Sequence, residues 1–189
     1  GEVCIRGENI MKGYWGRPDA TAEAIDDDGW FHSGDLVQID EQGYITVVDR
    51  IKDVINSGGV LIASREVEDA LAAHPAVAEC AVIGVADPLK GQRPSGYVVL
   101  KSGVETPEAG SEAEAALLDE LRQAVRRDVG PVADFRDVVV VDALPKTRSG
   151  KILRKTMREI ADGKTPNIPG TIEDASILDD LTPILRPGS

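Results

Sequence analysis

The chain has 189 residues, of which 42% are hydrophobic and 29% are charged, so it can bury the core of an ordinary soluble protein. Its formal net charge of -12 argues against a general nucleic-acid binder, and no apolar stretch approaches the roughly 20 residues of a membrane helix. Because Gly1 opens a segment that already has a strand pattern, we expect a piece of a longer protein. The two cysteines, Cys4 and Cys80, show no metal-ligand spacing and are expected to be buried residues of a cytoplasmic protein.

Residues 1–49 have the pattern of a small β-rich region. A strand is expected at 3–6, and a turn at 17–21 leads into a short helix. Further along, strands at 36–39 and 44–48 flank a turn that contains Gly43. This segment is therefore expected to be mainly antiparallel sheet.

The rest of the chain alternates between strands and helices. Two short strands flank a turn at 57–59, and helices are expected after N-caps at Ser64 and Ser111. The remaining expected elements are strands at 81–85, 96–100 and 138–141 and a short helix at 152–161. This order predicts an α+β fold in which helices cover a small antiparallel sheet. The Pro-rich tail from Lys164 carries only a weak helical signal, at 177–181.

A basic run interrupts this acidic chain, with six cations and no acid in residues 146–158. Four of the cations have helical spacing and would share one side of a helix: Lys151, Arg154, Lys155 and Arg158. The plain interpretation is a solvated helix face. Like charges in this arrangement repel by a few tenths of a kcal/mol per pair, however, and an anionic ligand or acidic partner would offset that cost.

A nucleotide-binding P-loop is excluded for this run. That motif needs Ser or Thr directly after its lysine, whereas Ile152 follows Lys151. We interpret the segment instead as a flexible Ser-Gly turn that presents a single lysine, Lys151.

Three further motifs each permit a structural and a functional interpretation. Asp35, at the end of the run 29–35, either caps a turn or accepts hydrogen bonds from a diol such as ribose. The charged run 49–53 is either a linker or a hinge. The glycines in 57–59 either form a hairpin turn or allow a thin ligand to approach the backbone. His32 is expected to be structural or to lie at the edge of a site.

Taken in order, these motifs resemble the adenylate-forming superfamily, which includes acyl-CoA synthetases, adenylation domains of peptide synthetases and firefly luciferase. The four matching segments are GYW, PDAT and DGWFHSGDL within 13–36, DRIKD at 49–53, SGG at 57–59 with EVE at 66–68, and PKTRSGK at 145–151. The resemblance covers nearly the whole chain, and four ordered motifs are hard to obtain by chance.

The resemblance implies a domain organisation. Residues 1–49 would be the β-rich end of a large ATP-binding domain, and 54–163 would be a small mobile C-terminal domain. Residues 50–53 would form the hinge between them, and 164–189 would be an extended tail. The phosphate loop, the adenine pocket and the acyl pocket would all precede the chain, so the chain alone is expected to be inactive.

The resemblance also implies an AMP-forming acid–thiol ligase that works in two steps. A carboxylate attacks the α-phosphate of ATP to give an acyl-adenylate and pyrophosphate, and the thiol of coenzyme A then displaces AMP. By position, Asp35 would hold the ribose hydroxyls, and Arg50 would contact the ribose or phosphate side. Lys151 would reach the carboxylate and α-phosphate, and Lys52 would be the hinge residue. Gly58 and Gly59 would lie beside the pantetheine arm of coenzyme A. No metal ligand is expected among these residues, because Mg2+ would be bound mainly by the missing large domain.

The expected substrate is a short-chain acid such as acetate or propionate, because the tail at 166–174 resembles that of short-chain synthetases. The departures are Leu61, Ala63 and Ser64, which stand where many members have Asn, Tyr and Pro, and this version resembles some fatty acyl-CoA ligases. The alternatives are therefore a medium- or long-chain ligase, an adenylation domain that loads a carrier protein, and a non-catalytic module of the same fold. In some acyl-CoA synthetases the lysine that matches Lys151 is reversibly acetylated, which implies an acetyltransferase and a deacetylase as partners.

Overall fold

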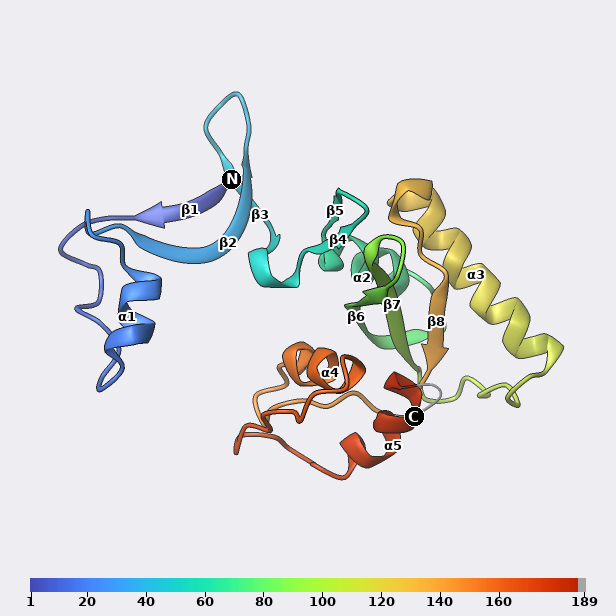
Figure 1. Cartoon of the computed structure of the whole chain (residues 1–189). Coiled ribbons are helices and arrows are strands. Elements are labelled where there is room, and N and C mark those ends of the chain that lie inside the picture. Colours follow the sequence, from blue (N-terminus) through green and yellow to red (C-terminus); the bar gives the residue numbers. More distant parts are fainter. Residues whose placement is uncertain (187–189) are drawn as a thin grey trace. The chain divides into compact units, whose positions relative to one another are not determined.

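The computed structural model describes residues 1–186, which divide into two compact units. The first unit is Gly1–Val54, and the second begins at Ile55 (Figure 1). Within the described residues, no helix is both long enough and apolar enough to cross a lipid bilayer. An α+β architecture, as expected from the sequence, is confirmed.

The first unit is a three-stranded antiparallel sheet in the order β1-β2-β3. Its elements are β1 (Glu2–Ile5), α1 (Pro18–Ala24), β2 (Phe31–Ile39), β3 (Ile45–Arg50) and the 3-10 helix η1 (Ile51–Asp53). The expected hairpin around Gly43 is present, with Ile39 paired to Ile45 and a φ of 86° at Gly43. Val37 is the buried hydrophobic residue of this unit.

The segment 29–35 differs from the expected turn. Residues from Phe31 onward belong to β2, which pairs with β1 on one side and β3 on the other. Gly34, with a φ of 73°, lies inside the strand close to a bulge between Leu36 and Val37. The glycine that suggested a turn therefore lies in an irregular strand, because pairing with a strand on each side satisfies the backbone hydrogen-bonding groups.

The second unit is built on a five-stranded sheet. Its strands are β4 (Ile55–Ser57), β5 (Val60–Ile62), β6 (Val77–Asp87), β7 (Gly91–Leu100) and β8 (Asp137–Val140). The order is β5-β4-β7-β6, and β8 also pairs with β7. The pairs are antiparallel except β7 with β8, which is parallel, so the sheet is mainly antiparallel, as expected from the sequence.

Helices cover both faces of this sheet (Figure 1). They are α2 (Ser64–Ala72), α3 (Glu112–Asp128), the 3-10 helix η2 (Pro131–Ala133), α4 (Arg154–Ala161) and α5 (Ile177–Leu185). Side chains alternate between two core clusters along the central strands, so that Val82 and Val98 face α2 and α3 while Ile83 and Tyr97 face α4 and α5. This burial on both faces explains why β6 and β7 read as continuous apolar runs.

Two helix ends test the predicted caps. Ser111 is the N-cap of α3, and its side chain accepts a hydrogen bond of 3.1 Å from the backbone N–H of Glu114, as expected. The Glu114 carboxylate accepts from the N–H of Gly110 rather than from that of the cap residue. Ser64 is the first helical residue of α2, and Ala63 is its N-cap, so the cap predicted there is misplaced by one position.

The tail also differs from the extended segment that we expected. Residues 177–185 form α5, and its side chains Leu178, Leu181 and Leu185 are buried in the cluster that also contains Met157 of α4. The weak sequence signal has a clear cause, because Pro183 lies inside the helix and lowers its intrinsic propensity. Burial of three leucines against α4 and the sheet outweighs that cost.

Candidate functional site

The loop that carries Lys151 is a short, internally bonded turn. The N–H of Thr147 donates to the carbonyl of Lys151 at 2.9 Å, and the N–H of Gly150 donates to the carbonyl of Thr147 at 2.8 Å. The hydroxyl of Thr147 accepts from the N–H of Lys151 at 3.1 Å and lies 2.9 Å from the hydroxyl of Ser149. Gly150 has a φ of 81°, which closes the turn. The Ser-Gly turn is thus present, but it is well bonded rather than free.

Ion pairs fix both ends of this loop. Before the turn, Lys146 forms a bidentate contact with Glu79 of β6 at 2.8 and 2.9 Å. After it, Arg154 at the start of α4 forms a bidentate contact with Glu68 of α2 at 2.7 and 2.6 Å. The same Glu68 carboxylate accepts from the backbone N–H of Val82 at 2.8 Å. The turn is therefore held between two charge-assisted contacts.

The cations of the basic run do not form one solvated helix face. Lys151 precedes α4, Arg154 is only 26% exposed and is bound to Glu68, and Lys155 lies 3.6 Å from Glu159. Among residues 1–186, by contrast, the exposed ammonium of Lys151 has no hydrogen bond or ion pair, and the same holds for the guanidinium of Arg148. The loop, which ion pairs hold at both ends, therefore carries two cationic side chains that have no acidic partner within the described residues.

The hairpin β4–β5 carries the expected pair of glycines at its tip. Both have positive φ, 61° at Gly58 and 89° at Gly59, which is the geometry of a two-residue hairpin turn. The N–H of Gly58 donates to the carbonyl of Lys90 at 2.8 Å, and the N–H of Gly59 donates to the side chain of Asn56 at 3.0 Å. Ser57, expected in the turn, instead ends β4, and its buried hydroxyl has no partner within the described chain.

Asp35 and Arg50 lie together in the first unit. They are register partners on β2 and β3, and Nε of Arg50 is 3.0 Å from Oδ1 of Asp35. Their side chains are 33% and 52% exposed, so the carboxylate can still accept hydrogen bonds from a polyol. The pair thus places a partly exposed carboxylate beside a guanidinium on neighbouring strands of the sheet.

The expected site residues therefore fall into two groups. Asp35, Arg50 and Lys52 belong to the first unit, whereas the two glycines of the hairpin and Lys151 belong to the second. Lys52 is an exposed residue of η1, and the first unit ends two positions later, at Val54.

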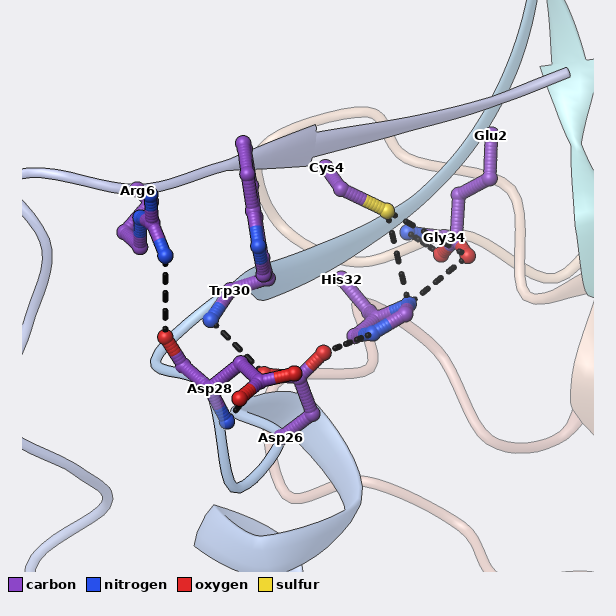
Figure 2. Close-up of polar contacts among 8 residues, drawn as sticks. All are labelled: Glu2, Cys4, Arg6, Asp26, Asp28, Trp30, His32 and Gly34. Carbon is purple, nitrogen blue, oxygen red and sulfur yellow. Dashed lines mark hydrogen bonds and ion pairs between the residues drawn. The ribbon is translucent and has the colours of Figure 1, made fainter.

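A separate polar cluster surrounds His32 in the first unit (Figure 2). Its Nδ1 is 2.9 Å from Oε2 of Glu2 and its Nε2 is 3.4 Å from Oδ2 of Asp26. The hydrogen bond with Glu2, and then that with Asp26, raises the pKa of His32 above its ordinary value, and His32 in turn lowers the pKa of Glu2. His32 thus joins β1, β2 and the loop at 26–28, in line with a structural role.

The cysteines differ from the buried residues that we expected. Cys4 is exposed, and its Sγ lies 3.5 Å from Nδ1 of His32, so this histidine does have a thiol neighbour (Figure 2). Cys80 is half-buried, and burial raises the pKa of its thiol to about 12. The position of Cys4 has a simple cause, because β1 lies at the edge of a small sheet.

Sequence reasoning missed the acidic residues that hold the loop. Glu68 lies on α2 between Val67 and Leu71, which are fully buried, so a carboxylate next to the apolar face could have indicated a buried partner. Glu79 offered no comparable signal, since its pairing with Lys146 spans 67 residues.

Comparison with known proteins identifies a family and relatives that this chain resembles. Residues 66–151 match the AMP-binding enzyme C-terminal domain. Feruloyl-CoA synthase from an Amycolatopsis species is 46% identical over 158 residues, which are 84% of this chain and 30% of that protein. The medium/long-chain-fatty-acid–CoA ligase FadD8 of Mycobacterium tuberculosis is 42% identical over 158 residues, which are 84% of this chain and 27% of that protein.

The fold is shared with solved structures as well. The anthranilate CoA ligase AuaEII, solved in complex with anthranoyl-AMP, matches with a TM-score of 0.73 and 31% identity over 86% of this chain and 30% of that one. The chain thus spans less than a third of the length of these relatives. Its match at residues 66–151, together with its similarity to CoA ligases in sequence and fold, shows that the chain belongs to the adenylate-forming superfamily through an AMP-binding enzyme C-terminal domain.

Proposed function

We propose that this chain is the C-terminal part of an ATP-dependent acyl-CoA ligase, in which Lys151 is the catalytic cation of the adenylation step. The observation that carries the proposal is the uncompensated ammonium of Lys151 on a loop fixed by ion pairs at both ends. A charge that stabilises nothing within the described fold is available for a ligand. The names of the relatives, which are CoA synthases and ligases, support the class of reaction.

In the first step, a carboxylate oxygen of the acid bonds to the α-phosphorus of ATP, and the bond from that phosphorus to the bridging oxygen breaks to release pyrophosphate. Lys151 would offset the negative charge that develops on the carboxylate and the α-phosphate. Asp35 would accept hydrogen bonds from the ribose hydroxyls, and Arg50, which contacts it, would lie on the ribose or phosphate side. Mg2+ would travel with the ATP phosphates, in the part of the enzyme that precedes this chain.

In the second step, the thiol of coenzyme A loses its proton to solvent, its sulfur bonds to the acyl carbon, and the bond from that carbon to the phosphate oxygen breaks to release AMP. We assign the change between the steps to a rotation at Lys52 that would withdraw Lys151 and bring in the hairpin tip. The tip is bare of side chains at Gly58 and Gly59, so the pantetheine arm could pass close to its backbone. We assign 1–49 to the end of the large domain, 50–53 to the hinge and 54–163 to the mobile domain, with the tail up to residue 186 packed onto it.

The acid itself is a finer proposal. The tail at 166–174 favours a short acid such as acetate or propionate, whereas the named relatives favour larger acids. The longer protein should be offered acetate, propionate, octanoate, palmitate and ferulate under identical conditions. A value of kcat/KM that is highest for acetate or propionate supports the short-chain proposal, and a maximum for any of the others contradicts it.

A fused enzyme tests the role of Lys151. The large part of the Amycolatopsis feruloyl-CoA synthase, joined to this chain, should form feruloyl-adenylate, and Lys151→Ala should slow that step by about 100- to 1,000-fold because a charge on the developing anion is lost. Thioester formation from supplied feruloyl-AMP should stay within a few-fold. Lys155→Ala removes a neighbouring cation that is paired within α4, and it should leave both steps unchanged.

Equal loss of both steps in Lys151→Ala would contradict the two-conformation account, and unchanged adenylation would contradict the catalytic role. The chain without the large part should give no carboxylate-dependent ATP–pyrophosphate exchange. Replacement of coenzyme A by a carrier protein in the thioester assay separates the ligase from a carrier-loading adenylation domain.

Two further assignments rest on the same proposal. Both cysteines are free, which fits a reducing compartment such as the cytoplasm. Acetylation of Lys151 by a lysine acetyltransferase would erase the charge that the first step needs, and a deacetylase would restore it.

A further inference from the structure

Three different metal-binding side chains, none of them assigned to the ligase reaction, meet on β1 and β2 (Figure 2). Cys4 Sγ lies 3.5 Å from His32 Nδ1 and 4.0 Å from Glu2 Oε2, and the last two atoms are 2.9 Å apart. The register of the sheet creates this meeting, because Cys4 and His32 are direct partners on neighbouring strands. Glu2, two positions before Cys4, shares its face of the strand.

These separations approach those of a tetrahedral metal site. With zinc bonds of about 2.3 Å to sulfur and about 2.0–2.2 Å to nitrogen and oxygen, tetrahedral ligand atoms lie roughly 3.4–3.6 Å from one another. The observed sulfur–nitrogen separation of 3.5 Å already fits. The other two differ by about half an ångström in opposite directions, which small side-chain rotations can supply.

Outer hydrogen bonds orient the three ligands. Oε1 of Glu2 accepts from the backbone N–H of Gly34 at 2.9 Å, which leaves Oε2 directed at His32. Nε2 of His32 faces Asp26, whose other oxygen accepts from the N–H groups of Asp28 and Trp30 at 3.0 and 2.9 Å. A carboxylate on the far nitrogen of a histidine is the usual outer partner of a metal ligand, because it fixes the tautomer and the ring.

We propose that Glu2, Cys4 and His32 bind a divalent transition-metal ion, with Zn2+ as the ion that suits this ligand set. A thiolate, an imidazole and a carboxylate are all zinc ligands, and the mixture of soft and hard donors disfavours Mg2+ and Ca2+. Cys4 is exposed, so a water molecule can take the fourth position. Coordination displaces the thiol proton of Cys4 and requires an unprotonated Nδ1 on His32, so protons are released when the ion binds.

Cobalt and zinc titrations of the 189-residue chain test the site. Co2+ should bind with a stoichiometry of one ion per chain and give the visible absorption of tetrahedral cobalt together with a thiolate-to-cobalt charge-transfer band. Added Zn2+ should displace the Co2+ and abolish both absorptions. In competition with a chromophoric chelator, Cys4→Ser, His32→Gln and Glu2→Gln should each weaken Zn2+ binding at least about 10-fold. Asp26→Asn, which alters only the outer partner, should weaken it by about 10- to 100-fold.

Matched controls come from the other thiol and the other imidazole of the chain. Cys80→Ser and His74→Gln should leave the Zn2+ affinity unchanged. If a variant fails to fold, the unsubstituted protein still tests the site. Zn2+ should slow the alkylation of Cys4, and the alkylation of Cys80 serves as the internal reference.

Three results would overturn the proposal. They are Zn2+ binding weaker than about 10 µM, an affinity that Cys4→Ser leaves unchanged, and alkylation of Cys4 that Zn2+ does not slow. The cluster would then be an ion pair with a neighbouring thiol. None of these results bears on the adenylation assay, so failure of the metal site and failure of the ligase function are distinguishable.

Discussion

His32 shows how the surroundings of one side chain set its charge. Two carboxylates face its two ring nitrogens, and both hydrogen bonds favour the imidazolium form. In the metal-free protein the pKa is therefore raised above the ordinary 6.5, and the folded state binds this proton more tightly than the unfolded state does. The resulting stabilisation is complete below pH 6.5 and is lost as the pH rises through the raised pKa. On the acid side, the lowered pKa of Glu2 gives the opposite trend, because its contribution is lost as the pH falls below about 4.5.

Titration by NMR in the presence of a chelator checks this behaviour. The ring protons of His32 should titrate with a midpoint above 6.5, and in Glu2→Gln that midpoint should move down because the strongest partner of the imidazolium is lost. His74→Gln assigns the signals, since the chain has two histidines. A midpoint that does not move in Glu2→Gln would show that the carboxylate is not the cause.

The elements around the loop show that its geometry depends on distant acids. α2 and α4 are joined by the contact between Glu68 and Arg154, whose side chains are 13% and 26% exposed. The Glu68 carboxylate also accepts a hydrogen bond from the backbone of β6, so one residue links two helices and a strand. The start of α4, and with it the turn before it, depends on this contact.

A double-mutant cycle measures that link. Arg154→Met should lower the free energy of unfolding by about 1.5–3 kcal/mol, because it removes two N–H donors from a carboxylate that is only 13% exposed. The combined variant Glu68→Gln with Arg154→Met should cost less than the sum of the two single variants, and urea unfolding gives all four values. Lys155→Ala, at the exposed pair with Glu159, should change stability by less than about 0.5 kcal/mol. Strict additivity in the cycle would mean that the ion pair contributes no coupling.

For the secondary-structure elements, the sequence predicted which strands are present better than it predicted the residues at which they begin and end. The apolar runs at 81–85 and 96–100 were recognisable, but β6 and β7 extend to Val77–Asp87 and Gly91–Leu100, with the buried Pro94 inside a strand. Proline signals a break locally, and only the pairing of Gly84 with Pro94 across the hairpin reveals a strand there. The motif around Lys151 was visible in the sequence, whereas its contacts with α2 and β6 were not, since they join residues more than 60 positions apart.

The whole molecule divides into two units with very different interiors. The second unit contains two core clusters on opposite faces of one sheet. In the first unit, Val37 is the buried hydrophobic residue, whereas Trp15, Tyr44 and Ile39 are exposed. With so little buried apolar surface, the first unit should be the less stable of the two.

Separate expression of the two units tests this difference. Residues 55–186 should fold alone and unfold in one cooperative transition, with dispersed amide signals in NMR. Residues 1–54 alone should unfold at a lower urea concentration than residues 55–186. An isolated first unit as stable as the second would contradict the prediction, as would loss of structure in the isolated second unit.

The solitary charge of Lys151 has a consequence for how variants of this protein can be found. Substitution of Lys146 or Arg154 removes a partner from an acid and so registers as a change in thermal stability. Substitution of Lys151 removes no contact within the described chain, so it should pass a thermal-shift screen unnoticed. Natural variation at this position would likewise be invisible to selection for folding, and only selection for chemistry could maintain the lysine.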